Sequence, residues 1–137
     1  GSFYTIKAFI DSMLDKEEND RKSIIFISSG SAFTGGGGGV HYTASKSGQH
    51  GLMRALAKEY GKAGINVNAI APRVIASHIL DQLYPDEKSK QELIEQIPIR
   101  RIGYPEDIGN LACFLASEKS TYIHGQIILM DGGRTYQ

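Results

Sequence analysis

Three side chains in the first third of the sequence have the types and the spacing for proton transfer. Tyr42 and Lys46 are four residues apart in a segment with helical periodicity, so a phenol and an ammonium leave the same helix face one turn apart. Ser29 lies thirteen residues before Tyr42, at the end of an apolar run. A hydroxyl, a phenol and a cation together favour proton exchange with a carbonyl or alcohol oxygen, with the carbon chemistry left to a cofactor.

The pairing of a phenol with an ammonium needs a particular environment. A free tyrosine has a pKa near ~10, and proton exchange at neutral pH requires about 4 kcal/mol of preferential stabilisation of the phenolate. At ~4 Å an ammonium supplies about 1 kcal/mol in bulk water but about 4 kcal/mol at an effective dielectric constant of ~20. We therefore expect Tyr42 and Lys46 to act only where water is largely excluded.

A strand, a glycine-rich loop and a long helix are predicted to position these groups. Residues 24–27 form a continuous apolar run, typical of a parallel strand that is buried on both faces. A helix is expected over residues 41–62, followed by a strand over residues 65–71 that Pro72 ends. Strand, helix and strand predict a parallel, right-handed βαβ unit. The glycines 35–39 match neither dinucleotide nor P-loop spacing, and we expect their loop to approach a ligand.

The rest of the chain shows further helix and strand patterns. An amphipathic helix is expected over residues 3–14, ended by a polar loop over residues 15–20. Short apolar stripes occupy residues 78–98. A helix is predicted from Pro105 to about residue 117, and an apolar strand over residues 126–130.

On these residues the sequence resembles the short-chain dehydrogenase/reductase family, whose members carry Ser and then Tyr-x-x-x-Lys at this spacing. Residues 44–45 and 47–48, Ala-Ser and Ser-Gly, are similar to the family too, and Gly125 to Gly133 matches its closing Gly-Gln-x-x-x-x-Asp-Gly-Gly pattern. Tyr84 and Lys88 also fit Tyr-x-x-x-Lys, but a proline intervenes and no glycine-rich loop precedes them. We interpret that second pair as solvated surface.

The resemblance implies roles for particular residues. Tyr42 would be the general acid/base, Lys46 would activate it and hold the nicotinamide ribose, and Ser29 would orient the carbonyl. Pro72, Val74 and Ser77 would lie along the nicotinamide, with a main-chain amide near Val74 and the Ser77 hydroxyl holding its carboxamide. The cofactor would be NAD or NADP, with no metal, and the sequence does not indicate which dinucleotide.

The segment after the second strand departs from the family at one position. Arg73 stands where glycine is usual, and either points to solvent or meets an anionic group of substrate or cofactor. The substrate is expected to be a small carbonyl or alcohol compound, in a pocket lined by residues 30–40 and 73–97. Residues 78–98 would form either a mobile lid, as in relatives, or a surface helical pair.

The expected fold class is α/β. The resemblance implies the later part of a Rossmann-type, doubly wound parallel sheet, with about three parallel strands, flanking helices and the first βαβ units absent. Residues 1–137 would form one incomplete domain, since roughly 100 residues would complete it ahead of Gly1. We expect such a piece to be inactive alone, because it lacks the turn that grips the pyrophosphate.

Composition excludes several classes of partner. The chain has 137 residues, 41% hydrophobic and 22% charged, and 15 basic residues balance 15 acidic ones. This neutral balance gives no electrostatic case for nucleic acid or an anionic membrane. No signal peptide or membrane span is evident, and a cytoplasmic location is expected. The single Cys113 falls in an apolar helical pattern and is predicted to be buried.

Other functions stay open beside the oxidoreductase. The helices at 3–14 and 41–62 resemble those that pack between subunits in the family, so a homo-oligomer is expected and a non-catalytic association fragment is the main alternative. Ser29, His41 and His50 admit a serine hydrolase, although no Gly-x-Ser-x-Gly pattern is present. A zinc site has little support, because the sequence has one cysteine and no His-Glu-x-x-His.

Overall fold

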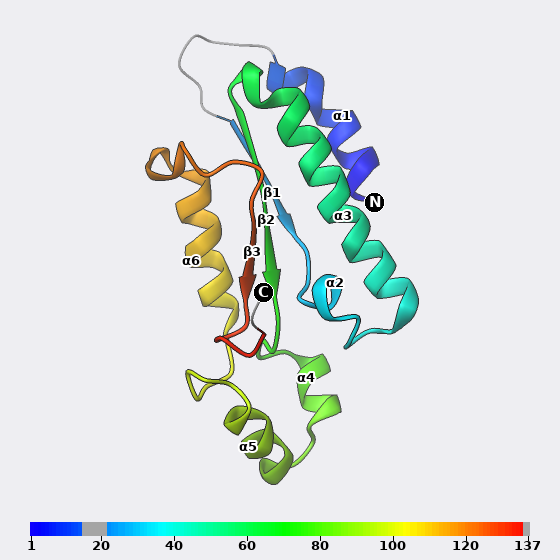
Figure 1. Ribbon diagram of the computed structural model, residues 1–137, viewed down its shortest axis with the longest axis vertical. Coiled ribbons are helices and arrows are strands. Elements are labelled where there is room, and N and C mark those ends of the chain that lie inside the picture. Colours follow the sequence, from blue (N-terminus) through cyan, green and yellow to red (C-terminus); the bar gives the residue numbers. More distant parts are fainter. Residues whose placement is uncertain (15–21, 136–137) are drawn as a thin grey trace.

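Three strands form one parallel sheet in the order β1-β2-β3, in a computed structural model that describes residues 1–14 and 22–135 (Figure 1). The strands are β1 (Lys22–Ile27), β2 (Ile65–Pro72) and β3 (Ile127–Met130). Central β2 consists mostly of small and β-branched apolar residues, and its side chains from position 67 to 71 are almost completely buried. The parallel sheet confirms the expected α/β fold class.

The strand register aligns the carboxyl ends of the strands. Ile27 of β1 pairs with Ile70 of β2, and Pro72 of β2 pairs with Met130 of β3. Residues that follow the strands therefore meet at one edge of the sheet, which is where ligands bind in open parallel sheets.

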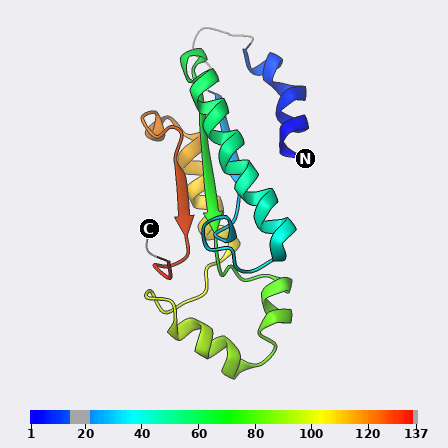
Figure 2. The ribbon, with the colours of Figure 1, turned by 45° about the vertical axis from the view of Figure 1, so that its right-hand side comes forward.

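Two long helices cover opposite faces of this sheet. Figures 1 and 2 show α3 (Gly39–Tyr60) on one face, with α1 (Ser2–Leu14) beside it, and α6 (Pro105–Ala116) on the other. Met53 and Leu56 of α3 pack with Phe26 of β1 in the main hydrophobic cluster. This packing sets the position of α3 relative to the end of β1.

The remaining elements are short. They are the helices α2 (Ser31–Thr34), α4 (His78–Leu83) and α5 (Glu87–Glu95) and the 3₁₀ turns η1 (Gly61–Ala63) and η2 (Glu118–Ser120). Helices α4 and α5 extend beyond the carboxyl ends of the strands (Figure 1). They bury Leu80, Leu93 and the following Ile97, which lie outside the main hydrophobic cluster.

The structure differs from the sequence expectations at four places. The run at 24–27 is not buried on both faces, because β1 is an edge strand of the described sheet, in which Phe26 is buried but Ile27 is 45% exposed. The α3 helix begins at Gly39 rather than at position 41, and helix α2 was not expected. The prediction that Cys113 is buried is wrong, because its side chain is exposed on α6. Cys113 is two residues from both Leu111 and Leu115, and two residues of helix turn a side chain to the opposite face. The predicted polar loop at 15–20 lies outside the described residues.

Candidate active site

The residues that follow β1 continue to form main-chain hydrogen bonds with β2. The Ser28 amide donates to the Ile70 carbonyl at 2.7 Å, and the Gly30 amide donates to the Pro72 carbonyl at 2.9 Å. Ser29, between them, is half-buried. These bonds hold Ser29 at the carboxyl edge of the sheet, as its place after the apolar run predicted.

The hydrogen bonds of the Ser29 hydroxyl leave it free to donate but not to accept. Its oxygen accepts hydrogen bonds from the Ser31 amide at 3.2 Å and from the Ser31 hydroxyl at 3.0 Å. A serine oxygen has two acceptor positions and one hydrogen, so both acceptor positions are occupied and only the hydrogen is left for another group. Ser29 is therefore arranged as a donor. Sequence reasoning missed buried Ser31, although serine two residues after serine, at a helix start, is a pattern that favours such local bonds.

Tyr42 and Lys46 share one face of α3, as their spacing predicted. The Lys46 Nζ lies 5.7 Å from the centre of the Tyr42 ring and donates to the Ile27 carbonyl of β1 at 2.9 Å. An ammonium has three hydrogens, so two are left for a ligand. Both side chains are half-exposed, and the described residues do not by themselves provide the dry environment that the Coulomb estimate requires.

The glycine loop makes room for the tyrosine ring. Gly38 has a φ of 148°, a conformation that residues with a side chain rarely adopt, and a Cβ at this position would overlap the Tyr42 Cδ1. Sequence reasoning expected the loop to approach a ligand. What the structure shows is that Gly38 approaches Tyr42 itself.

The segment after β2 is held in a strained turn. Val74 has a φ of 59°, which is unusual for a β-branched residue. Its carbonyl accepts from the Gly103 amide at 3.0 Å, and the Ala76 amide donates to the Gly103 carbonyl at 2.8 Å. The Ser77 oxygen accepts from the Leu80 amide at 3.3 Å and caps α4, which leaves the Ser77 hydrogen for another acceptor.

Arg73 has partners within the chain. The stem of its side chain lies against Gly30, where a Cβ would come within 2.9 Å of the Arg73 Cβ, and its guanidinium donates to the Thr135 hydroxyl at 2.5 Å. The Arg73 side chain is half-buried, so it does not simply point to solvent, and in this structure its partner is Thr135 near the C-terminus rather than an anionic group.

The sequence-predicted residues fall into two groups at this edge. Ser29 follows the end of β1 and is bonded by Ser31, and Lys46 bonds to Ile27 at that strand end and adjoins Tyr42. Val74 and Ser77 lie on the separate turn after Pro72. Among the described residues, no hydrogen bond joins the Ser29 hydroxyl to Tyr42 or Lys46, so a bound molecule would have to connect them.

Other candidate sites have less structural support. Ser29 is not paired with a histidine in the described part of the chain; instead its neighbour Ser28 lies 2.8 Å from His50. Within residues 1–14 and 22–135 no group of His, Cys, Asp or Glu side chains could hold a metal ion. No helix in the same residues is long and apolar enough to cross a lipid bilayer.

Comparisons with known proteins point in one direction. A family model described as enoyl-(acyl carrier protein) reductase matches residues 1–135. L-rhamnose-1-dehydrogenase of Scheffersomyces stipitis is 39% identical over 133 residues, which is 97% of this chain and 51% of that protein. The 2-dehydro-3-deoxy-D-gluconate 5-dehydrogenase of Dickeya dadantii is 46% identical over 110 residues, which is 80% of this chain and 44% of that protein.

A solved structure agrees with these relatives. A crystal structure from Agrobacterium tumefaciens, provisionally named a 2-deoxy-D-gluconate 3-dehydrogenase and containing bound NADP, superposes with a TM-score of 0.86 at 39% identity. The match covers 96% of this chain and 53% of that one. The chain thus spans about half the length of the curated relatives it matches. Its sequence and fold show that it belongs to the short-chain dehydrogenase/reductase family.

Proposed function

We propose that the protein is an NAD(P)-dependent oxidoreductase that interconverts a carbonyl and an alcohol on a small molecule. One observation carries the proposal: Lys46 lies beside Tyr42 on one face of α3, with its ammonium held by the Ile27 carbonyl at the end of β1. The contact of Lys46 with Tyr42 and with Ile27 supports a common role for the phenol, the cation and the Ser29 hydroxyl. The names of the two relatives described above, both dehydrogenases, support the proposal.

The three polar side chains divide the proton chemistry. Tyr42 is the general acid/base that gives a proton to the carbonyl oxygen in reduction and removes it in oxidation. Ser29 donates its hydrogen to the same oxygen, because both of its acceptor positions are filled by Ser31. Lys46 favours the phenolate form of Tyr42 electrostatically once a bound ligand excludes water.

A nicotinamide dinucleotide fits the donors left over at this edge. The cofactor supplies the hydride transfer at carbon. Lys46, with two hydrogens available, and Tyr42 would hold the ribose, whereas Pro72, the main chain of Val74 and the Ser77 hydroxyl would hold the carboxamide. The NADP bound in the A. tumefaciens relative supports this assignment, and the choice between NAD and NADP stays open.

The remaining expectations from the sequence stay predictions. We propose that the protein acts as a homo-oligomer, that it is cytoplasmic, and that the 137 residues form one incomplete Rossmann-type domain that is inactive alone. Titration of the isolated 137-residue chain with NADP by calorimetry tests the last point. Strong binding with rapid turnover would contradict it.

Replacement of Tyr42 by phenylalanine tests the catalytic assignment. In the intact protein, Tyr42→Phe should lower kcat by at least about 10²-fold, because the general acid/base is removed while the ring remains. Tyr122→Phe is the matched control, since the Tyr122 side chain is fully exposed outside the predicted pocket ranges and its replacement should leave kcat unchanged. Full activity of Tyr42→Phe would refute the role.

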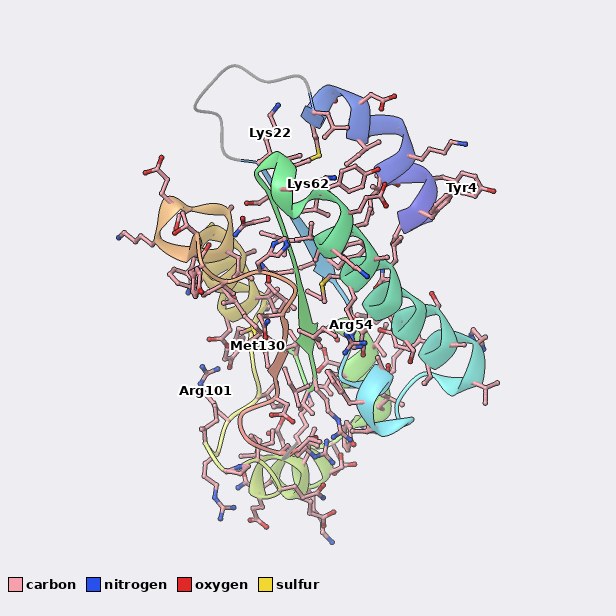
Figure 3. The ribbon with its side chains drawn as sticks, turned by 45° about the horizontal axis from the view of Figure 1, so that its top comes forward. Tyr4, Lys22, Arg54, Lys62, Arg101 and Met130 are labelled. Atoms are coloured by element: carbon pink, nitrogen blue, oxygen red, sulfur yellow. The ribbon has the colours of Figure 1, made fainter. Side chains whose placement is uncertain are left out.

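A non-catalytic association module is the second candidate. Helix α1 presents Phe3, Tyr4 and Phe9 with 57%, 73% and 61% of their surfaces exposed, and Tyr4 points away from the body of the molecule (Figure 3). Exposed aromatic side chains of this kind favour contact between subunits. Oligomers that dissociate in a Phe3→Ser/Phe9→Ser variant, together with no NADP binding by the intact protein, would favour this function over the oxidoreductase.

A further inference from the structure

Lys46 is held at two points by consecutive residues at the end of β1. Its side-chain ammonium donates to the Ile27 carbonyl at 2.9 Å. Its main-chain carbonyl accepts from the Ser28 hydroxyl at 3.3 Å. The second contact continues to a third group, because the Ser28 oxygen also lies 2.8 Å from the His50 Nε2.

The polarity of this chain of contacts follows from the single hydrogen of serine. A main-chain carbonyl can only accept, so the Ser28 hydrogen is used by the Lys46 carbonyl. The Ser28 oxygen then accepts from His50, which requires a hydrogen on the Nε2 of the ring. His50 Nε2–H therefore donates to the Ser28 oxygen, and the Ser28 hydroxyl donates to the main-chain carbonyl of Lys46.

The surroundings of His50 support a fixed, neutral ring. His50 and Ser28 are only 6% and 4% exposed, and the His50 ring packs on Phe33 of α2 with ring centres 5.0 Å apart. Burial, followed by the charge of Arg54 one turn further along α3, lowers the pKa of His50. A neutral imidazole with one hydrogen suits a ring that donates from Nε2.

We propose that Ser28 and His50 are positioning residues for Lys46. Because His50 lies one turn after Lys46 on α3, the Ser28 bond fixes this turn of the helix against the end of β1. Ser29 follows Ser28 directly, so the same bond sets the distance between the donor on the strand and the phenol and ammonium on the helix. The proposal rests on the oxidoreductase function and adds two residues to it that touch no substrate.

A set of four variants in the intact protein tests the proposal. Ser28→Ala and His50→Leu should each lower kcat about tenfold, since small displacements of reacting groups are costly, while KM stays within about twofold. His50→Gln keeps a donor near the place of Nε2 and should restore most of kcat. Ser120→Ala is the control: Ser120 is equally buried and donates to the Leu115 carbonyl far from the site, so it should affect stability but not kcat.

The double variant separates positioning from stability. Ser28→Ala alone leaves a buried Nε2–H without its partner, whereas Ser28→Ala/His50→Leu replaces both partners by apolar groups and should regain the melting temperature. If the two residues position Lys46, kcat stays low in the double variant. Recovery of kcat together with the melting temperature would overturn the proposal.

A spectroscopic measurement is independent of turnover. Long-range ¹H–¹⁵N spectra should show the Nε2–H tautomer of His50, and the Lys46 carbonyl carbon should shift upfield in Ser28→Ala as it loses a donor. An Nδ1–H tautomer, or an unmoved Lys46 carbonyl, would overturn the proposal even in a protein without activity. An active Tyr42→Phe variant would instead refute the proposed function, so the two failures are distinguishable.

Discussion

Two regions at the carboxyl edge of the sheet hold their polar groups in different ways. In the strand–helix unit, residues 22–60, the bonds cross between elements: Lys46 reaches the Ile27 carbonyl, and His50 reaches Ser28. In the helical segment, residues 73–103, many bonds join residues that are closer in sequence, such as the Leu80 amide to Ser77 and the Lys90–Asp81 ion pair, which joins α5 to the neighbouring α4 at 3.0 Å. Of the groups proposed to react, Lys46 is held by a contact that is distant in sequence, whereas Ser29 is bonded by the nearby Ser31.

The two regions also differ in their contribution to the main hydrophobic cluster. The strand–helix unit supplies much of the main hydrophobic cluster, whereas Leu80, Leu93 and Ile97 of the helical segment lie outside it. Segments with few contacts to a core open at lower free energy than the rest of a protein. Burial of these residues outside the main hydrophobic cluster favours the lid interpretation of residues 78–98 over a fixed surface pair.

Removal of the Lys46 charge should greatly lower the activity that we assign to the strand–helix unit. Lys46→Met keeps much of the side-chain length but loses both the bond to the Ile27 carbonyl and the charge beside Tyr42. We expect kcat to fall by on the order of 10²–10⁴ in steady-state assays. Lys58→Met, at an exposed position in the last turn of the same helix, is the control and should behave as wild type. Equal activity of the two variants would contradict the role of Lys46.

A methyl group in the glycine loop should displace the tyrosine ring. The Cβ of Gly38→Ala would overlap the Tyr42 ring, and the φ of 148° adds strain. We expect kcat to fall about tenfold or more, because the phenol leaves its place. In Gly36→Ala the new Cβ meets only the Thr34 hydroxyl at 3.8 Å, an ordinary contact, so its kcat should not change. A Gly38→Ala variant with normal kcat would show that the ring position is not critical.

Two apolar substitutions sharpen the contrast inside the helical segment. Leu93 is 1% exposed, so Leu93→Ala should lower the free energy of unfolding by about 2–5 kcal/mol. Ile79 is 68% exposed, so Ile79→Ala should leave stability nearly unchanged and raise KM several-fold if it lines the substrate pocket. Urea unfolding and initial-rate kinetics measure both effects. An unchanged KM would remove Ile79 from the predicted pocket wall.

The smallest effect on stability is expected at the start of α6, where an ion pair joins Arg101 to the first turn of the helix. The Arg101 guanidinium binds both carboxylate oxygens of Asp107, at 2.7 and 2.9 Å, and with the Tyr104 amide holds the pKa of Asp107 at about 2. An unfolded aspartate has a pKa near ~3.9, so the unfolded chain takes up a proton first as the pH falls. The stabilisation is present above about pH 4 and is lost between about pH 4 and 2.

Urea midpoints measured from pH 5 to 2 test this sign, a range that spans both pKa values. Asp107→Asn should flatten the acid dependence of stability in that window, because the titrating group is gone. Glu106→Gln changes the adjacent exposed carboxylate and should leave the slope as in wild type. An identical slope for Asp107→Asn and wild type would contradict the pairing.

Much of the fold could be predicted because its signals are local. The apolar runs at 24–27 and 65–71 indicate strands, and both strands occur with nearly those bounds. The predicted burial holds for β2 but not for β1, which lies at the edge of the described sheet and exposes Ile27. Helix α2 was missed, because a four-residue helix between glycines has too few residues for periodicity to appear. The burial of Cys113 was predicted wrongly, because only one face of an amphipathic helix is buried and Cys113 lies on the other face.

The sequence by itself determined which groups are available and on which face they stand. Four-residue spacing puts Tyr42 and Lys46 together on any helix, and the end of an apolar strand delivers Ser29 to the sheet edge. Only the tertiary structure decided what holds them. The bonds of Ser28 to His50 and of Lys46 to Ile27 join residues 22 and 19 positions apart, and such contacts depend on how α3 packs on β1 rather than on any local pattern.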